Sequence, residues 1–269
     1  MAMVRRAFLD CGPGAQLHYR HAGKPGNPAL VLLHQAPSSS EMFEKLMLLL
    51  ADSYYLIAPD MPGFGDSTAP AERMSIAALA ESCGAALVEL DIGPFALFGH
   101  HTGASVALAL AVNRAASPSS LILSGPPLLG REMLTSLPAL AEPFPARSDG
   151  RHFGQTWRRM RAKDKSVPLQ LTQRESLLAL QMGQNYQQVY QAVTDYDFAG
   201  ALKKITVPAL LFAGTGDGLH GSVKPAAGIV SAAHPELRVE TASINGATTY
   251  VCETHTRQVA QLIRNFLMT

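Results

Sequence analysis

A short segment near the middle of the chain most constrains the fold. Residues 95–98 have the composition of a brief buried strand, and residues 104–110 that of a helix of small and apolar side chains. Only residues 99–103, Gly-His-His-Thr-Gly, lie between them. A turn this sharp brings the backbones so close that glycine is needed on either side of the central residue. We therefore predict a strand–turn–helix unit with His101 at its apex, at a positive φ that histidine tolerates better than most side chains.

Strand-like and helix-like segments alternate along most of the chain. The segments with helical character outside the turn are residues 38–50, 75–90 and 254–267. This alternation predicts an α/β fold with a mostly parallel sheet and helices on both of its faces. The predicted strands are residues 16–20, 29–33, 54–58, 95–98, 121–123, 207–213 and 237–241.

Residues 128–203 interrupt the alternation. They contain no convincing strand, and Phe153, Trp157 and Met160 fall on one face of a predicted helix. A helical insertion between two core strands is typical of a cap over the carboxyl edge of the sheet, where ligands bind in open α/β folds. We therefore predict a core made of residues 1–127 and 204–269, with a helical cap at 128–203 inserted after the sixth strand.

The composition narrows the partners and the compartment. The chain is 47% hydrophobic and 16% charged with a net charge of +1, which argues against nucleic acid or an anionic membrane as the main partner. Its three cysteines are widely spaced and predict neither a disulfide framework nor a zinc site. No signal-peptide pattern is visible at the start. We expect a cytoplasmic protein that binds a small-molecule substrate, and the sequence leaves room for a homodimer.

Four motifs lie at the ends of predicted strands: 34–37 (His-Gln-Ala-Pro), 59–67 (Pro-Asp-Met-Pro-Gly-Phe-Gly-Asp-Ser), the turn at 99–103, and 208–217, which ends in Gly-Thr-Gly-Asp. In this order and spacing, the chain resembles capped α/β-hydrolase-fold proteins of the lipase and epoxide hydrolase type over nearly its whole length. The resemblance implies a sheet of eight strands. It also makes the first motif an oxyanion loop, the third a nucleophile turn and the fourth the strand that ends at the catalytic acid.

Two of the three catalytic positions depart from that family's pattern. His101 stands where the nucleophile belongs, and Thr248 stands where the catalytic histidine belongs, counting back from Glu253. Asp217 alone keeps its residue type. In a Ser-His-Asp site the histidine deprotonates the serine and the acid orients the histidine. This chain therefore cannot work as an ordinary serine esterase.

We expect His101 to act as a general base or acid paired with Asp217. An unperturbed imidazole titrates near pH ~6.5, close to working pH, as proton transfer requires. Because Thr248 is much smaller than histidine, the vacated space lets His101 face Asp217 directly or through one water. The resemblance implies that the backbone N–H groups of Ala36 and Thr102 form an oxyanion hole.

The expected substrate is a small, largely apolar carbonyl compound, such as an ester, a lactone or a compound with a C–C bond to be cleaved. We expect no cofactor and no metal. Hydrolysis is the preferred reaction, and a lyase or isomerase reaction stays open. The residues expected to contact the substrate are His34, Gln35, His100, Phe153, Trp157, Thr248 and Tyr250.

Three other interpretations also stay open from the sequence. His101 could attack as a nucleophile and form an acyl-imidazole, although a second base would then be needed for turnover. The protein could be a catalytically silent binder or sensor of small molecules. Finally, His34, His100, His101, His220 and Asp217 could gather around a metal, although no helix carries a histidine pair at i and i+4.

Overall fold

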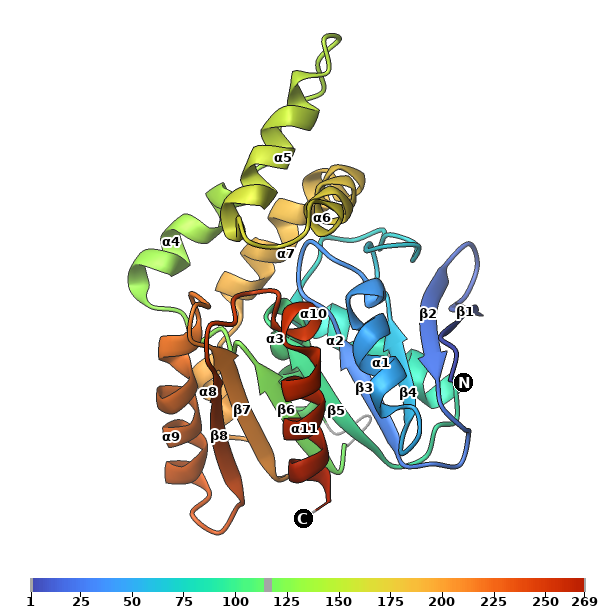
Figure 1. The fold of residues 1–269 in the computed structure, drawn as a ribbon, viewed down its shortest axis with the longest axis vertical. Helices are drawn as coiled ribbons and strands as arrows, with labels where there is room; N and C mark the ends of the chain where they lie inside the picture. Colours follow the sequence, from blue (N-terminus) through green and yellow to red (C-terminus); the bar gives the residue numbers. More distant parts are fainter. Residues whose placement is uncertain (1, 114–117, 269) are drawn as a thin grey trace.

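The computed structural model describes residues 2–113 and 118–268, which form one eight-stranded sheet (Figure 1). The strand order is β1-β2-β4-β3-β5-β6-β7-β8. The strands from β4 to β8 in this order pair in parallel, and β1 and β2 add an antiparallel edge. The predicted α/β-hydrolase fold with a mostly parallel sheet is thus confirmed. The strands are β1 (Arg5–Asp10), β2 (Gln16–Ala22), β3 (Ala29–Leu33), β4 (Tyr55–Pro59), β5 (Phe95–His100), β6 (Ser120–Ser124), β7 (Ala209–Gly214) and β8 (Val239–Ile244).

Helices cover both faces of the sheet. Val31 and Leu33 of β3 belong to the apolar cluster that includes α2, α3 and α9, whereas Leu30 and Leu32 belong to the cluster with α1 and α11. Every residue of β3, β5, β6 and β7 is buried. Strands buried on both faces read as unbroken apolar runs rather than as an alternating pattern. The elements outside residues 128–203 are η1 (Ser40–Phe43), α1 (Glu44–Leu50), α2 (Ile76–Glu89), α3 (Thr102–Val112), η2 (His220–Ser222), α9 (Val223–Ala233), α10 (Val251–Thr254) and α11 (Thr256–Leu267).

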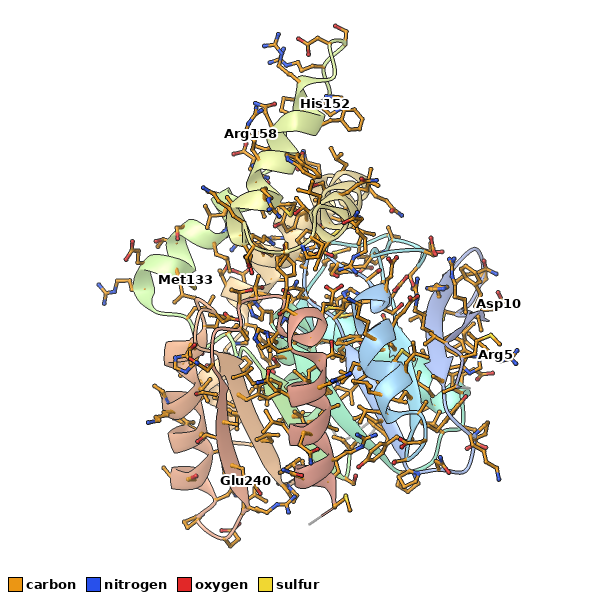
Figure 2. The ribbon with its side chains drawn as sticks, viewed as in Figure 1. Arg5, Asp10, Met133, His152, Arg158 and Glu240 are labelled. Carbon is orange, nitrogen blue, oxygen red and sulfur yellow. The ribbon has the colours of Figure 1, made fainter. Side chains whose placement is uncertain are left out.

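Between β6 and β7 the chain forms helices and no strand, in a stretch that we call the helical segment (residues 128–203). Figure 1 shows α4 to α7 beyond one end of the sheet, and α5 extends furthest from it. His152 and Arg158, labelled in Figure 2, lie on this projecting helix. None of the helices in the described parts of the chain has the length and apolar character needed to cross a bilayer. The helices of the segment are α4 (Arg131–Leu140), α5 (Arg151–Lys163), α6 (Leu169–Met182), α7 (Gln184–Asp195) and α8 (Phe198–Leu202).

Asp60 fixes the loop that follows β4. Its Oδ2 accepts hydrogen bonds from His18 Nδ1 at 2.8 Å and from the backbone N–H of Asp66 at 3.0 Å, and its Oδ1 accepts from the N–H of Ser40 at 2.7 Å. Burial raises the pKa of this carboxyl, but the hydrogen bonds and the neighbouring histidines outweigh burial and hold the pKa well below its usual range. One buried carboxylate therefore joins β2, η1 and the second sequence motif.

Replacing Asp60 by asparagine tests this role. Because its pKa is lower in the fold than in the unfolded chain, the stabilisation is complete above about pH 5 and is lost as the pH falls through the acid range. We expect Asp60→Asn to lower the free energy of unfolding at pH 7 by about 3 kcal/mol. We also expect the variant to lose less stability than the parent between about pH 5 and pH 3. Urea denaturation at several pH values measures both effects. Asp91→Asn, which replaces an exposed carboxylate, is the control. If the stability of Asp60→Asn changed with pH in the same way as that of the parent, the interpretation would be wrong.

Candidate active site

The turn between β5 and α3 holds His101 in a strained backbone conformation. Its φ is 50° and its ψ is −113°, so the predicted positive φ is confirmed. The N–H of His101 donates to the carbonyl of Ser124 at 2.9 Å, and its own carbonyl accepts from Ala104 at 2.8 Å. These bonds hold the peptide on both sides of the residue. The imidazole is thereby presented at the carboxyl end of a central strand.

Glycine at 103 and 125 leaves room for this turn and for the ring. A Cβ at Gly103 would lie 2.1 Å from the carbonyl oxygen of Leu33, so only glycine lets α3 approach β3 this closely. Gly125 has a φ of 58°, and a Cβ there would lie 2.5 Å from Cδ2 of the His101 ring. The absence of a side chain at residue 125 therefore provides the space that the imidazole occupies.

His101 and Asp217 contact each other directly. Nε2 of His101 donates to Oδ2 of Asp217 at 2.7 Å, and Oδ1 of Asp217 accepts from the N–H of Leu219 at 2.8 Å. The Asp217 side chain is 1% exposed and that of His101 is 19% exposed. Burial raises the pKa of Asp217, but His101 and the Leu219 hydrogen bond outweigh burial and lower that pKa well below its usual range. The carboxylate is therefore charged and fixes the imidazole tautomer with the proton on Nε2.

This tautomer leaves Nδ1 of His101 as the basic nitrogen. Within the described part of the chain, no hydrogen bond engages that atom. An imidazole whose other nitrogen is held by a carboxylate is the arrangement that general acid–base chemistry uses. The pair can accept a proton on one side while the buried charge of Asp217 stabilises the resulting cation.

His101 and Asp217 line a cavity of about 260 Å³ at the carboxyl ends of the strands. Gln35, Ala36 and Thr102 line it too, so the structure brings together five of the predicted site residues. Neither the N–H of Ala36 nor that of Thr102 donates a backbone hydrogen bond in the described residues. Lys163, Tyr190 and Thr249 are polar wall residues that the sequence analysis does not predict. The apolar wall consists of Pro127, Leu129, Met133, Leu137, Val193 and Leu219.

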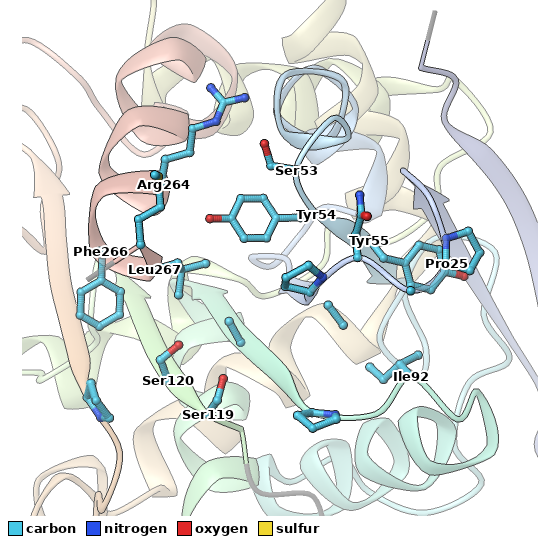
Figure 3. Close-up of a pocket in the computed structure, with 18 of the residues that line it drawn as sticks. Pro25, Ser53, Tyr54, Tyr55, Ile92, Ser119, Ser120, Arg264, Phe266 and Leu267 are labelled. Atoms are coloured by element: carbon cyan, nitrogen blue, oxygen red, sulfur yellow. The ribbon is translucent and has the colours of Figure 1, made fainter.

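A larger hollow of about 1220 Å³ lies at the other end of the sheet, where the parallel strands begin (Figure 3). Tyr54, Tyr55 and Arg264 line it, and none of the predicted site residues does. No histidine belongs to its wall. Ligands of open α/β sheets bind at the carboxyl ends of the strands, so we place the candidate active site in the smaller cavity.

Comparison with known proteins agrees with this fold. The profile of the alpha/beta hydrolase fold family matches residues 28–222, which is more than half of the chain. The chain belongs to the alpha/beta hydrolase fold family. An uncharacterized hydrolase of Saccharomyces cerevisiae is 43% identical over 100 residues, which is 37% of this chain and 34% of that protein. A soluble epoxide hydrolase of a Corynebacterium species is 35% identical over 94 residues, covering 35% of this chain and 32% of its own. These matches thus span about a third of each relative.

Solved structures match over almost the whole chain. A structure of E-2-(acetamidomethylene)succinate hydrolase has a TM-score of 0.79 and 21% identity, and the match covers 99% of this chain and 100% of the other. An epoxide hydrolase of Vigna radiata has a TM-score of 0.78 and 18% identity, and the match covers 98% of both chains. At these identities, the likeness shows the alpha/beta hydrolase fold and not a shared reaction.

Two histidines that were expected to contact the substrate, His34 and His100, do not line the cavity that contains His101 and Asp217. His34 is buried, where its Nδ1 donates to the carbonyl of Gln35 at 2.8 Å and its Nε2 accepts from the N–H of Met61 at 3.0 Å. His100 is also buried, and its Nε2 donates to the carbonyl of Thr249 at 2.8 Å. Nδ1 of His100 contacts the Ser124 hydroxyl at 3.0 Å. Both ring nitrogens of His34 and both ring nitrogens of His100 therefore have hydrogen-bond partners inside the protein. We therefore revise both residues to a structural role.

Four more predicted substrate contacts are not part of the cavity wall. The hydroxyl of Thr248 donates to Oδ2 of Asp164 at 2.6 Å. Tyr250 is 1% exposed and packs in the interior. Phe153 is 55% exposed near the start of the projecting helix α5. Trp157 lies one turn further along the same helix and does not line the cavity. Phe153 and Trp157 do not reach the cavity because α5 extends away from the sheet, so the apolar face predicted for this helix does not cover the site (Figure 1).

The histidines also do not gather as a metal site. His220 contacts the Ser243 hydroxyl at 2.9 Å and is not in the cavity wall. In the described part of the chain, the one group of three metal-type ligands is His18, Asp60 and Asp66, none of which lines the cavity. The Arg6 guanidinium contacts both His18 and Asp66, so a cationic side chain already lies next to two members of this group.

The burial of His100 predicts a pH effect that needs no substrate. Burial and the neighbouring His101 lower the pKa of His100 to about 3, so it is neutral in the fold and protonates more readily in the unfolded chain. The unfolded state then binds more protons as the pH falls below ~6.5, and stability decreases. This single group is expected to cost about 2 kcal/mol between pH 6.5 and pH 5.

We expect His100→Gln to be less stable than the parent at pH 7 but to show a smaller loss between about pH 6.5 and pH 5. Chemical denaturation at matched pH values measures the difference in slope. The half-buried His255, which lies outside the cavity wall, provides the control variant His255→Gln, which is expected to keep the parent slope. An unchanged slope in His100→Gln would show that His100 is not the titrating group.

Proposed function

We propose that the chain is a hydrolase of small, largely apolar carbonyl compounds, such as esters or lactones, or compounds in which a C–C bond is hydrolysed. In this proposal, His101 and Asp217 act as an acid–base pair in place of a serine nucleophile. The observation that supports it most is the 2.7 Å contact from Nε2 of His101 to Asp217 in a cavity wall. That contact leaves the basic Nδ1 without a partner among the described residues. The membership in the alpha/beta hydrolase fold family supports the hydrolytic class.

The proposed reaction begins with a water molecule in the cavity. Nδ1 of His101 removes a proton from the water as its oxygen attacks the carbonyl carbon, and the negative charge of Asp217 stabilises the imidazolium. The carbonyl oxygen becomes an oxyanion, which accepts hydrogen bonds from the N–H groups of Ala36 and Thr102. The imidazolium then returns the proton to the leaving group. A positioned base contributes about 10²–10⁴-fold, and each oxyanion donor about 3 kcal/mol.

We propose that the helical segment acts as the cap of this site. Met133 and Leu137 of α4 and Val193 of α7 line the cavity, so the segment supplies much of its apolar wall. A cavity of about 260 Å³ with such a wall suits a small apolar body better than a long chain. Residues 1–127 and 204–269 would then supply the chemistry, and residues 128–203 the selectivity.

An acyl-imidazole on His101 is a weaker proposal. Its turnover would require a second base, and no other histidine of the described residues lines the cavity. A silent binding protein is the second candidate function. It is favoured by the contact between Thr248 and Asp164, which gives the position of the usual catalytic histidine a structural role. A lyase or isomerase reaction would use the same His101 base on a carbon acid.

The variant His101→Ala tests the proposed function. Turnover of the best substrate from a panel of p-nitrophenyl esters and lactones is expected to fall about 10²–10⁴-fold in kcat, because the base is lost while the cavity remains. His255→Ala, a histidine outside the cavity, is expected to keep the parent rate. Unchanged turnover in His101→Ala would refute the proposal, and ligand binding without any turnover across the panel would favour the binding protein.

Resistance to a serine-directed reagent provides an independent test. Because the turn carries an imidazole, incubation with diisopropyl fluorophosphate is expected to leave the intact mass and the activity of the protein unchanged. A serine esterase treated in parallel shows that the reagent is active. A stoichiometric adduct that peptide mapping assigns to a serine would mean that another residue is the nucleophile.

A further inference from the structure

A cation faces the candidate active site from the helical segment. Lys163 is the last residue of α5, and it lines the same cavity as His101 and Asp217. Among the described wall residues it is the one lysine or arginine. A lysine in a mostly apolar wall is costly to bury unless its charge has a partner, so its presence there needs a physical reason.

The surroundings of Lys163 keep it charged. Burial alone would lower the pKa of its ammonium group, but Tyr190, Tyr250 and Glu175 outweigh burial, and the pKa is raised. The nitrogen also lies 5.9 Å from the centre of the Tyr186 ring, where the electron-rich face attracts a cation. Lys163 is therefore a stable positive charge at neutral pH.

No carboxylate of the described residues forms an ion pair with Lys163. The neighbouring cation differs in this respect, because Arg174 contacts Glu175 and Glu253 at 2.7 Å each. Glu175 accepts a further hydrogen bond from the Ser38 hydroxyl at 3.0 Å, so Arg174 and Ser38 hold its Oε1, whereas its buried Oε2 has no partner in the described structure and forms no ion pair with Lys163. Tyr190 and Glu175 thus support the positive charge of Lys163, but no carboxylate of the described residues pairs with it directly.

Two further polar side chains, Tyr190 and Gln35, belong to the wall of the same cavity. The Tyr190 hydroxyl donates to the carbonyl of Ala36 at 3.2 Å, which connects α7 to the loop after β3. Gln35 accepts from the Thr249 hydroxyl through Oε1 at 2.9 Å, while its Nε2 has no partner in the described structure. A buried amide N–H without an acceptor is rare in proteins and is often explained by a bound ligand or water.

Resting on the proposed hydrolysis, we propose that Lys163 binds an anionic group of the substrate. The substrate would then be a carbonyl compound that carries one carboxylate, with a short apolar chain between the two groups. The carbonyl lies at His101 and the N–H groups of Ala36 and Thr102, the apolar chain contacts the leucine and methionine side chains of the wall, and the carboxylate contacts Lys163. Such a site rejects neutral analogues because they leave the lysine charge unpaired.

The test uses two matched series of probes. Monoethyl esters of the dicarboxylic acids from malonic to adipic carry one carboxylate, and the corresponding diethyl esters carry none. Binding is measured by calorimetry on the His101→Ala protein, in which turnover of the substrates is expected to be slow. We expect the best monoethyl ester to bind about 10- to 100-fold more tightly than its diethyl partner, as a charge-assisted contact provides.

Substitutions at 163 separate charge from packing. Lys163→Met in the same background is expected to remove the preference by weakening the monoester alone, and Lys163→Arg is expected to retain it. Lys165→Met, which removes an exposed lysine two residues away, should leave both affinities unchanged. The inference is overturned if diesters bind as tightly as monoesters, or if Lys163→Met weakens both series equally. If Lys163→Met does not fold, the comparison of monoesters with diesters on protein that retains Lys163 can still overturn the inference.

The outcome also distinguishes this inference from the proposed function. A carboxylate preference that depends on Lys163, without turnover of any ester by the parent protein, supports the anion site and contradicts the hydrolase. Turnover that depends on His101, with equal rates and affinities for monoesters and diesters, supports the hydrolase and refutes the anion site.

Discussion

The close packing of α3 against the sheet is the constraint on which the site depends. The Leu33 carbonyl occupies the space where a side chain at Gly103 would lie, so the helix begins almost in contact with the strands. The chain can enter such a helix only through a sharp turn, and His101 takes the positive φ that this turn requires. A non-glycine residue in a sparsely populated region costs of the order of 1–3 kcal/mol. Hydrogen bonds of its N–H and carbonyl to Ser124 and Ala104 offset that cost.

The residues around the turn are mutually adapted in size. In the serine pattern that the chain resembles, a histidine from another loop lies between the nucleophile and the acid. Here the imidazole itself starts from the turn and reaches Asp217 directly. This needs a position without a side chain at Gly125, because a Cβ there would collide with the ring. The Thr248 hydroxyl contacts Asp164 instead of this pair.

The sequence was sufficient for the fold and for the turn that carries His101 because those features have strict local causes. The turn at 99–103 and its positive φ follow from glycine spacing, whereas the pairing of His101 with Asp217 was expected from the resemblance to the hydrolase motifs, either directly or through one water. The outer wall did not follow in the same way. Lys163 and Tyr190 reach the cavity only through the path of α5 and α7, which no local pattern encodes. Phe153 and Trp157 form an apolar face that matches a cap helix in sequence, yet α5 extends away from the sheet.

Two smaller differences have the same origin. The edge strand β1 is not predicted, because its side chains are largely exposed and lack the apolar run of the central strands. His34 and His100 were expected in the cavity because they belong to the motifs, but a motif places a backbone, and the side chain can still point inward. Their ring nitrogens satisfy buried backbone groups of Gln35, Met61 and Thr249. Proximity in sequence to a reactive residue thus says little about contact with its substrate.

The helical segment packs on the core through buried apolar side chains such as Val189 and Phe198, and a few polar contacts also cross the boundary, which bears on how the site selects a ligand. Tyr190 bonds to the carbonyl of Ala36, and Arg174 pairs with Glu253 across the boundary between the two parts. Such polar contacts add directional constraints to the apolar packing, although their net contribution to stability is small. The same helices carry the cavity-lining Lys163 and the apolar wall. The apolar packing and these bonds together therefore set the distance between the proposed anion contact and His101, and this distance would define the length of molecule that the site accepts.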